Sequence, residues 1–424
     1  MIEAAHSARW LPAFFLAALL LPPLPVGLGE GNLHPALAVA ALGVAAGVLK
    51  LGEWRFSADL LNLALLAFFS VLVASLGPAA IYAGLDVAAA SAARVALFGI
   101  SVYVFFYARH GPRAEGGGSA RGTLRLLLGA AVAAALFACL DFHFQFPAPA
   151  NFGAQFLWLS SGVYRRAQGL FYEASTLGNF CVFFLVMIAA QLARAKEERV
   201  APGGVLLACG VPLGTALVLS YSRASLVSLA VSMSVLLVMC RARWRVGRLA
   251  AWSLATAAVF EVLTYAVFPT FATAYWTRLR ASAEYAFSAP EVALSGRVAS
   301  WEALGDFLVA QPWHAVVGIG YKTLPYSDFV GQAVVADNMY LSLLVETGVL
   351  GLGALLLWCG AALAVSYRAA RSGEGERSFF GVWFFCFWSG QMVQMMSGDL
   401  LTYWRVLPLY FWVLAMAVRE SRAA

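Results

Sequence analysis

Polar residues of types that suit group transfer stand in short stretches between long apolar segments: Arg165, Arg166, Glu173, Arg223, Arg297, Lys322 and Asp337. The guanidinium group of arginine binds phosphate oxygens through a planar fork of donors and stays charged in a dry site. A carboxylate can take the proton from an attacking hydroxyl group. These residue types therefore predict a site that binds an anionic group and activates a nucleophile.

The elements that must position these residues are apolar helices. The chain of 424 residues is 62% hydrophobic and 12% charged, whereas soluble domains carry about 25% charged residues. This composition excludes an ordinary soluble enzyme, a disordered chain and a secreted disulfide scaffold. The sequence predicts an all-α polytopic membrane protein that forms a single domain over residues 1–424, with about 12 transmembrane helices. We expect these helices near 11–29, 35–49, 58–76, 88–108, 124–142, 170–193, 203–220, 222–240, 249–268, 339–366, 379–397 and 401–418.

The distribution of cations predicts the orientation of the helices. With the N-terminus in the cytoplasm, 19 of the 28 Lys and Arg residues fall on the cytoplasmic side, which is the bias of the positive-inside rule. We therefore expect both termini in the cytoplasm (N-in/C-in). Because this rule accounts for the basic clusters, the net charge of +6 does not indicate binding to nucleic acid.

The remaining cations fall on the outer side, where topology does not require them and where burial near the membrane is costly. We expect Arg94 and Arg405 to snorkel from helix ends toward water. For Arg223 the snorkelling alternative stays open, although the neighbouring serines favour a polar pocket. A functional role is expected for the cations in unusual outer segments, namely Arg165, Arg166, Arg223, Arg297 and Lys322.

Two outer segments differ from ordinary short connections. Residues 143–169 link the fifth and sixth predicted helices, and residues 269–338 form a long loop between the ninth and tenth. Loops of that length usually carry function. Within the long loop, Ser295 is expected to cap a helix that Pro312 ends. Apolar residues recur along it at helical spacing, which predicts an amphipathic helix.

Five stretches in these regions resemble one family, the O-antigen ligase and Wzy-type O-antigen polymerase superfamily of bacterial inner-membrane glycosyltransferases. The similarity covers roughly residues 160–365, and the long outer loop has the place that it has in the family. The stretches are Arg166–Gly178 (RAQGLFYEASTLG), Ser220–Ser225 (SYSRAS), Gly296–Trp301 (GRVASW), Gly318–Gly320 (GIG) and Asp337–Leu352 (DNMYLSLLVETGVLGL).

The resemblance implies a reaction and its partners. In such enzymes an undecaprenyl-pyrophosphate-linked oligosaccharide donates its glycan, at the periplasmic face of the inner membrane, to an acceptor glycolipid. The acceptor is a second lipid-linked repeat unit in polymerases and lipid A-core in ligases. The resemblance further implies a glycosyltransferase-C-like helical fold and no metal or nucleotide cofactor, and it leaves open whether a chain-length regulator binds besides the membrane lipids.

The resemblance also implies roles for individual residues. Pyrophosphate or glycan binding is expected from the outer cations and from Asn338 and Tyr340. Ligases usually carry a His-Asn pair at the end of the long loop, whereas this chain has Asp337-Asn338. The difference favours a polymerase and puts a His-based mechanism in doubt. Asp337 is the first candidate for the general base.

Two further carboxylates have open alternatives. Glu173 is the second candidate base, although a charge at a helix N-terminus explains it equally well. Glu346 falls within an apolar helix, where an ionisable group is costly and usually functional. We expect Glu346 to belong to a structural polar network.

Other functions compete with the glycosyltransferase interpretation. The ligase shares the fold and the donor and differs in its acceptor. A secondary transporter of twelve helices is more distant, because transporters commonly have sequence repeats and paired broken helices near the midplane. Neither is evident in this sequence. A cell-wall polymerase of the shape and elongation type is a further alternative, but its signatures are not evident either.

Overall fold

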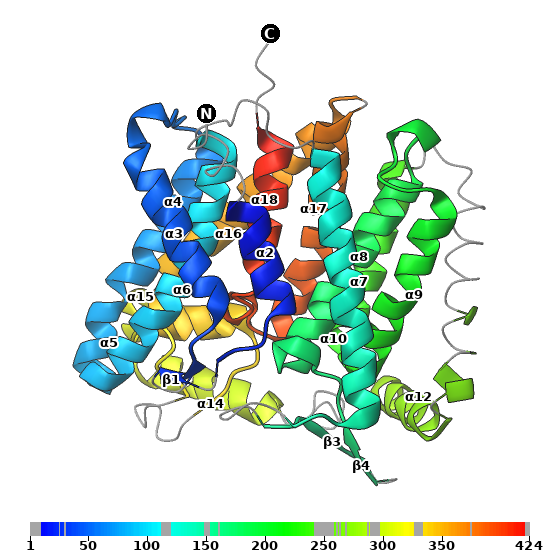
Figure 1. Cartoon of the computed structure of the whole chain (residues 1–424). Coiled ribbons are helices and arrows are strands. Elements are labelled where there is room, and N and C mark those ends of the chain that lie inside the picture. The colour runs from blue at the N-terminus through cyan, green and yellow to red at the C-terminus, as the bar shows by residue number, and fades with distance from the viewer. Residues whose placement is uncertain are drawn as a thin grey trace.

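The computed structural model describes residues 10–24, 26–28, 31–111, 120–147, 153–159, 162–240, 258–259, 262, 264–267, 269–285, 288, 297–325, 334–373 and 375–419. These residues form a bundle of helices (Figure 1). The α-helices are α2 (Trp10–Leu20), α3 (Pro35–Leu49), α4 (Leu60–Ala74), α5 (Leu76–Ala83), α6 (Leu85–His110), α7 (Ala120–Phe144), α8 (Ala174–Leu192), α9 (Gly203–Leu219), α10 (Arg223–Cys240), α12 (Pro269–Glu284), α14 (Arg297–Ala310), α15 (His314–Val317), α16 (Met339–Arg371), α17 (Glu376–Gln394) and α18 (Leu407–Val418).

Strands are a minor part of the described structure. β1 (Gly27–Leu28) pairs with β2 (Gly31–Asn32), and β3 (Phe156–Leu159) pairs with β4 (Gly162–Arg165), both antiparallel. Short 3-10 turns join several helices, among them η2 (Gly169–Phe171) and η6 (Leu400–Thr402). The predicted all-α class is thus confirmed, with two small hairpins added.

Several helices have the length and apolar composition to cross a membrane, which confirms a multi-pass membrane protein. Among the described residues six spans meet both criteria: Leu60–Ala83, Leu85–His110, Ala120–Phe144, Ala174–Leu192, Arg223–Cys240 and Met339–Arg371. Four shorter apolar helices accompany them: α2, α3, α9 and α18. The predicted segment 249–268 falls largely outside the described residues. The total of about twelve spans, their orientation and the outer position of the loop therefore stay predictions.

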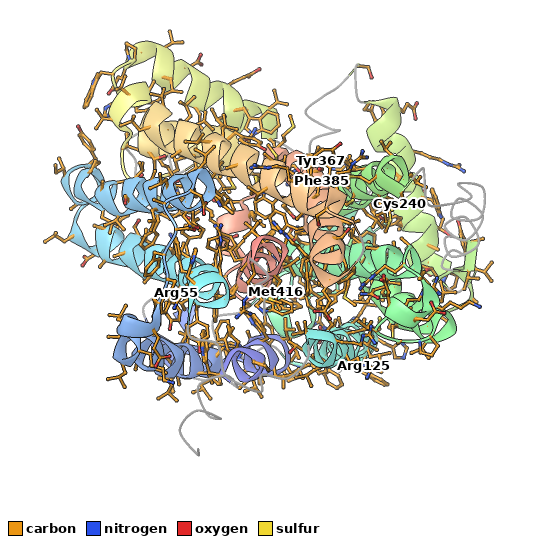
Figure 2. The ribbon with its side chains drawn as sticks, turned by 90° about the horizontal axis from the view of Figure 1, so that it is seen from above. Arg55, Arg125, Cys240, Tyr367, Phe385 and Met416 are labelled. Carbon is orange, nitrogen blue, oxygen red and sulfur yellow. The ribbon has the colours of Figure 1, made fainter. Side chains whose placement is uncertain are left out.

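The core of the bundle lies around α17 and α18. Nearly every side chain of α18 is buried, and Figure 2 places Met416 of this helix near the centre when the bundle is seen from above. Aromatic rings fill the space between neighbours; for example, the ring of Phe183 lies 4.4 Å from that of Trp383 and 4.5 Å from that of Tyr410. Such ring pairs bury large apolar areas in preferred tilted geometries.

Amide and hydroxyl groups join the central helices inside the apolar core. The amide nitrogen of Asn179 donates to the side-chain oxygens of Gln391 and Gln394, and the hydroxyl of Tyr410 donates to the oxygen of Asn179. Gln394 in turn donates to Ser225 Oγ at 3.2 Å. Hydrogen bonds of this kind hold helices together in a medium that offers no water. They connect α8, α10, α17 and α18.

Helix α16 is broken at Gly348, whose φ of 68° is non-helical. The break leaves backbone carbonyls without their helical partners, and the segment after α15 supplies donors for them. Ile319 N donates to Val345 O at 3.1 Å, and Gly320 N donates to Glu346 O at 2.8 Å. The break therefore fixes the segment that leads to Lys322.

The predicted helix of the long loop is present as α14, while its predicted cap Ser295 lies outside the described residues. Leu304 and Phe307 of α14 are buried in a small second core with Ile319, Leu324, Val334, Ala336 and Val345. Figure 1 shows α12, α14, β3 and β4 at the lower end of the bundle, and the α16–α17 turn at the upper end.

Candidate site at one end of the helical bundle

Three arginines and two carboxylates gather at the lower end of the bundle, each at the boundary of an element. Glu173 is the residue before α8, and Asp337 lies two residues before α16. The Arg166 guanidinium lies within electrostatic range of Glu173, Arg297 and Asp337. Arg223 lies within range of Arg297. We call Arg166, Arg223, Arg297, Glu173 and Asp337 the arginine–carboxylate group.

Arg166 is anchored to the turn between α9 and α10. Its Nε donates to Ser220 O at 2.9 Å, and the next residue, Ala167, donates its backbone N–H to Leu219 O at 2.9 Å. Burial lowers the pKa of Arg166, and the nearby Arg297 lowers it as well, while Tyr403 and Glu173 act in the opposite direction. A half-buried cation with a second cation beside it favours an anionic ligand.

Glu173 is the less exposed carboxylate of this group, half-buried, and lies just outside the span Ala174–Leu192. Its Oε2 accepts a hydrogen bond from Thr176 Oγ1 at 2.6 Å. Burial raises the pKa of Glu173, although the Thr176 hydroxyl and the Arg166 guanidinium partly oppose this effect. A raised carboxylate pKa is typical of a group that takes up a proton near neutral pH.

Arg297 and Asp337 form the exposed side of the group. Arg297 Nε lies 3.1 Å from Asp337 Oδ2, and the two side chains are 27% and 47% exposed. Asp337 has a φ of 45°, in the left-handed region that Asp adopts more readily than most residues. Trp301 Nε1 donates to Ala336 O at 2.6 Å. Helix α14 thus contacts Asp337 through Arg297 and the preceding residue, Ala336, through Trp301.

The other predicted substrate-binding residues are engaged elsewhere. Arg165 pairs with Asp141 at 3.3 Å, and both side chains are buried, which ties β4 to the end of α7. Asn338 caps α16 by accepting from Tyr340 N at 3.1 Å and Leu341 N at 3.2 Å. The Tyr340 hydroxyl donates to Met392 O at 2.7 Å. The structure thus brings none of these three side chains into the arginine–carboxylate group.

A second charged group, which we call the lysine–carboxylate group, consists of Lys322, Asp399 and Glu346. The ammonium of Lys322 forms an ion pair with Asp399, and both also act electrostatically on Glu173. Glu346 is 2% exposed and accepts from Leu324 N at 3.4 Å. The role of Glu346 in a structural polar network stays a prediction. Asp399 also caps the turn that follows it, because its Oδ1 accepts from Leu401 N at 2.9 Å.

Two residues near the site have roles that the sequence did not indicate. Tyr403 is buried, acts electrostatically on Glu173 and Asp337, and shares a side-chain hydrogen bond with Ser175. The expectation that Arg405 snorkels to water is wrong, because its side chain is only 6% exposed. The only indication of these two residues in the sequence is that each is a polar residue within an apolar segment.

The guanidinium of Arg405 satisfies backbone carbonyls at a helix end. It donates to Ala18 O at 2.8 Å, to Leu21 O at 3.0 Å and to Leu170 O. The first two carbonyls belong to the C-terminal end of α2, where helical partners are missing and a cation is favoured. Arg405 thereby fixes the turn η2, which leads into Glu173.

Comparison with known proteins supports the class that the fold defines. Residues 206–356 match a family model described as O-antigen ligase, which confirms the resemblance to the O-antigen ligase and Wzy-type polymerase superfamily. A search of curated proteins gives no match to the chain.

The matched segment contains part of the site. Arg223, Arg297, Lys322, Asp337 and Glu346 fall within residues 206–356, while Arg166 and Glu173 precede it. Within the described parts of the chain, no group of three or more His, Cys, Asp or Glu side chains has the arrangement to hold a metal ion.

Proposed function

We propose that this protein polymerises undecaprenyl-pyrophosphate-linked oligosaccharides at the periplasmic face of the bacterial inner membrane. The observation that carries the proposal is the convergence of Arg166, Arg223 and Arg297 with Glu173 at one end of the bundle. The family match to residues 206–356 supports a lipid-linked glycan as substrate. The chemistry of the group supports the roles of its members.

The arginines are proposed to hold the pyrophosphate of the donor. During transfer, the bond between the anomeric carbon of the glycan and the pyrophosphate oxygen breaks, and its electron pair stays on that oxygen. Fixed guanidinium groups stabilise such developing charge in a site that excludes water. Arg297 is 27% exposed while it pairs with Asp337, so an incoming phosphate can reach it from solvent.

Glu173 is proposed as the general base. The acceptor hydroxyl forms the new bond to the anomeric carbon, and its proton passes to the Glu173 carboxylate. The raised pKa that burial gives Glu173 suits this role, because a base is most effective when its pKa lies near the working pH. Asp337, which the sequence favoured, is exposed and paired with Arg297. We therefore assign to Asp337 the orientation of Arg297 and contact with the acceptor.

A polymerase is favoured over a ligase by the residue pair at the end of the long loop. Asp337-Asn338 occupies the place where ligases of this superfamily usually have His-Asn, as the resemblance implies. The ligase remains the second candidate function, since residues 206–356 match a family described by that name.

Transfer by the purified protein tests the proposal. The wild type is incubated with lipid-linked repeat units alone and then with added lipid A-core, and the products are separated by size. We expect a ladder of longer lipid-linked glycans from repeat units alone. Product that forms only with lipid A-core would establish the ligase instead, and no product with either acceptor would contradict both assignments.

The base is identified by comparing Glu173→Gln with Asp337→Asn in the same assay. We expect Glu173→Gln to lower kcat by about 10²-fold or more, the usual contribution of a general base. Asp337→Asn is expected to lower kcat by a smaller factor. The reverse order would return the role of base to Asp337.

A further inference from the structure

Lys322 does not extend into the arginine–carboxylate group, because its ammonium is bound by Asp399. The two side chains are only 12% and 15% exposed. The backbone around Lys322 is fixed by Ser91, whose hydroxyl donates to Tyr321 O, and by Thr323 Oγ1, which donates to Gly320 O at 2.7 Å. The cation is therefore held at a defined place and does not swing toward a ligand.

Asp399 is held equally firmly from the other side of the pair. Its Oδ1 accepts from Leu401 N at 2.9 Å, and its backbone carbonyl accepts from Thr402 Oγ1 at 2.6 Å. The ion pair thus joins the segment after α15 to the turn between α17 and α18. Both partners are constrained by bonds that do not involve substrate.

Glu173 is the functional group that this pair faces. The charged and titratable groups that act on Glu173 are Arg166, Lys322 and Asp399, together with Tyr403. The hydrogen bond between Tyr403 and Ser175 packs the turn that follows Asp399 against the first residues of α8. The ion pair therefore lies within electrostatic range of Glu173, and its turn is joined to α8 two residues beyond Glu173.

We propose that Lys322 and Asp399 are positioning residues, whose fixed charges set how readily Glu173 accepts a proton during transfer. The inference rests on the proposed function, because it requires Glu173 to act as the base. Under this inference Lys322 does not bind substrate, although the sequence placed it among the substrate-binding residues. Neither residue needs to touch donor or acceptor.

Each member of the pair acts on Glu173 with its own sign. A fixed ammonium favours the charged carboxylate, and a fixed carboxylate disfavours it. Removing Lys322 therefore makes Glu173 keep its proton up to higher pH, and removing Asp399 makes it release the proton at lower pH. A residue that only holds the fold together has no reason to produce opposite shifts.

The test is the pH dependence of kcat for glycan elongation between about pH 5 and pH 9, where loss of the base on protonation gives an acidic limb. We compare wild type with Lys322→Gln, Asp399→Asn and the double variant. The readout is the ratio of kcat at the alkaline end of this range to kcat at the acidic end. We expect this ratio to rise by about threefold in Lys322→Gln and to fall by about threefold in Asp399→Asn. Shifts of this size are expected when one unit of charge is removed at short range. The double variant is expected to return toward the wild-type ratio.

A second ion pair of the same type provides the matched control. Arg109 pairs with Asp59 at 2.7 Å, and Arg109 lies 18 residues beyond Ser91 on α6, about 27 Å along the helix axis. Arg109→Gln and Asp59→Asn are expected to leave the shape of the pH profile unchanged. Thermal unfolding of every variant checks that it is folded.

The outcomes separate the inference from the proposed function. If wild type elongates the glycan but both single variants keep its pH profile, or shift it in the same direction, the inference is overturned and the proposed function stands. If Lys322→Gln does not fold, Asp399→Asn decides, because Asn still accepts the bond from Leu401 N. In that case an acidic limb that fails to move to lower pH overturns the inference. If wild type makes no product, the proposed function itself fails.

Discussion

At the scale of single residues, solvent exposure separates the two carboxylates that the sequence ranked as first and second candidate base, Asp337 and Glu173. Glu173 is half-buried and bonded to Thr176, whereas Asp337 is 47% exposed and paired with Arg297. Only the fold determines such differences in environment, and they change the chemistry of the same functional group. The order of the two candidate bases is therefore reversed in our proposal.

Glu173 is also expected to lower the stability of the fold at neutral pH. Its pKa is raised in the folded protein, so the stabilising contribution is present below the unfolded pKa and is lost as the pH rises through the folded pKa. Glu173→Gln is expected to raise the unfolding temperature by about 2 °C at pH 8, and by less at pH 4. The measurement is thermal unfolding in detergent. Glu302→Gln on the exposed side of α14 is the matched control, and a variant as stable as wild type at both pH values would contradict the expectation.

At the scale of elements, the helices could be predicted from the length of the apolar segments and the polar residues between them. The contacts between segments that are distant in the sequence could not be predicted. The helix in the long loop was expected near residues 295–311 and is found as α14. Its packing on Val334 and Ala336 could not be predicted, because these two residues lie in a segment with no regular apolar spacing. The same limit explains Arg405, whose partners Ala18 and Leu21 are backbone carbonyls that carry no sequence signal.

Arg405 is predicted to stabilise the junction of α2, η2 and α18. Arg405→Met removes the guanidinium donor from Ala18 O and Leu170 O, while Leu21 O keeps its bond to His34 Nε2 at 3.0 Å. The change is expected to cost on the order of 3 kcal/mol, since a buried acceptor without a partner costs about 1–3 kcal/mol. Arg405→Lys should recover only part of this, because an ammonium lacks the planar fork. Denaturant unfolding in detergent gives the comparison, with Arg368→Met on the exposed face of α16 as control. Equal stability of Arg405→Met and wild type would refute the role.

At the scale of the whole molecule, the elements that carry the candidate site residues begin or end near one another, and α12, α14, β3 and β4 lie at one end of the bundle (Figure 1). The apolar helices fix this arrangement through the aromatic core and the amides of Asn179, Gln391 and Gln394. Of the predicted site, Arg166, Arg223, Arg297, Glu173 and Asp337 come together, while Arg165, Asn338 and Tyr340 serve local structure. The sequence indicated which residues are polar, and the fold decided which of them face each other.

The central claim is that Arg166, Arg223 and Arg297 form one transfer site, and the most direct measurement is kcat for elongation of lipid-linked repeat units by the three Arg→Ala variants. Arg109→Ala, at the far end of α6, is the matched control for loss of a partly buried arginine. We predict that each site variant loses about 10²-fold or more in kcat, as when an electrostatic stabiliser of the transition state is removed. The control should stay within about threefold of wild type once the folded fraction is taken into account. Wild-type turnover in any site variant, or an equal loss in Arg109→Ala, would contradict the claim.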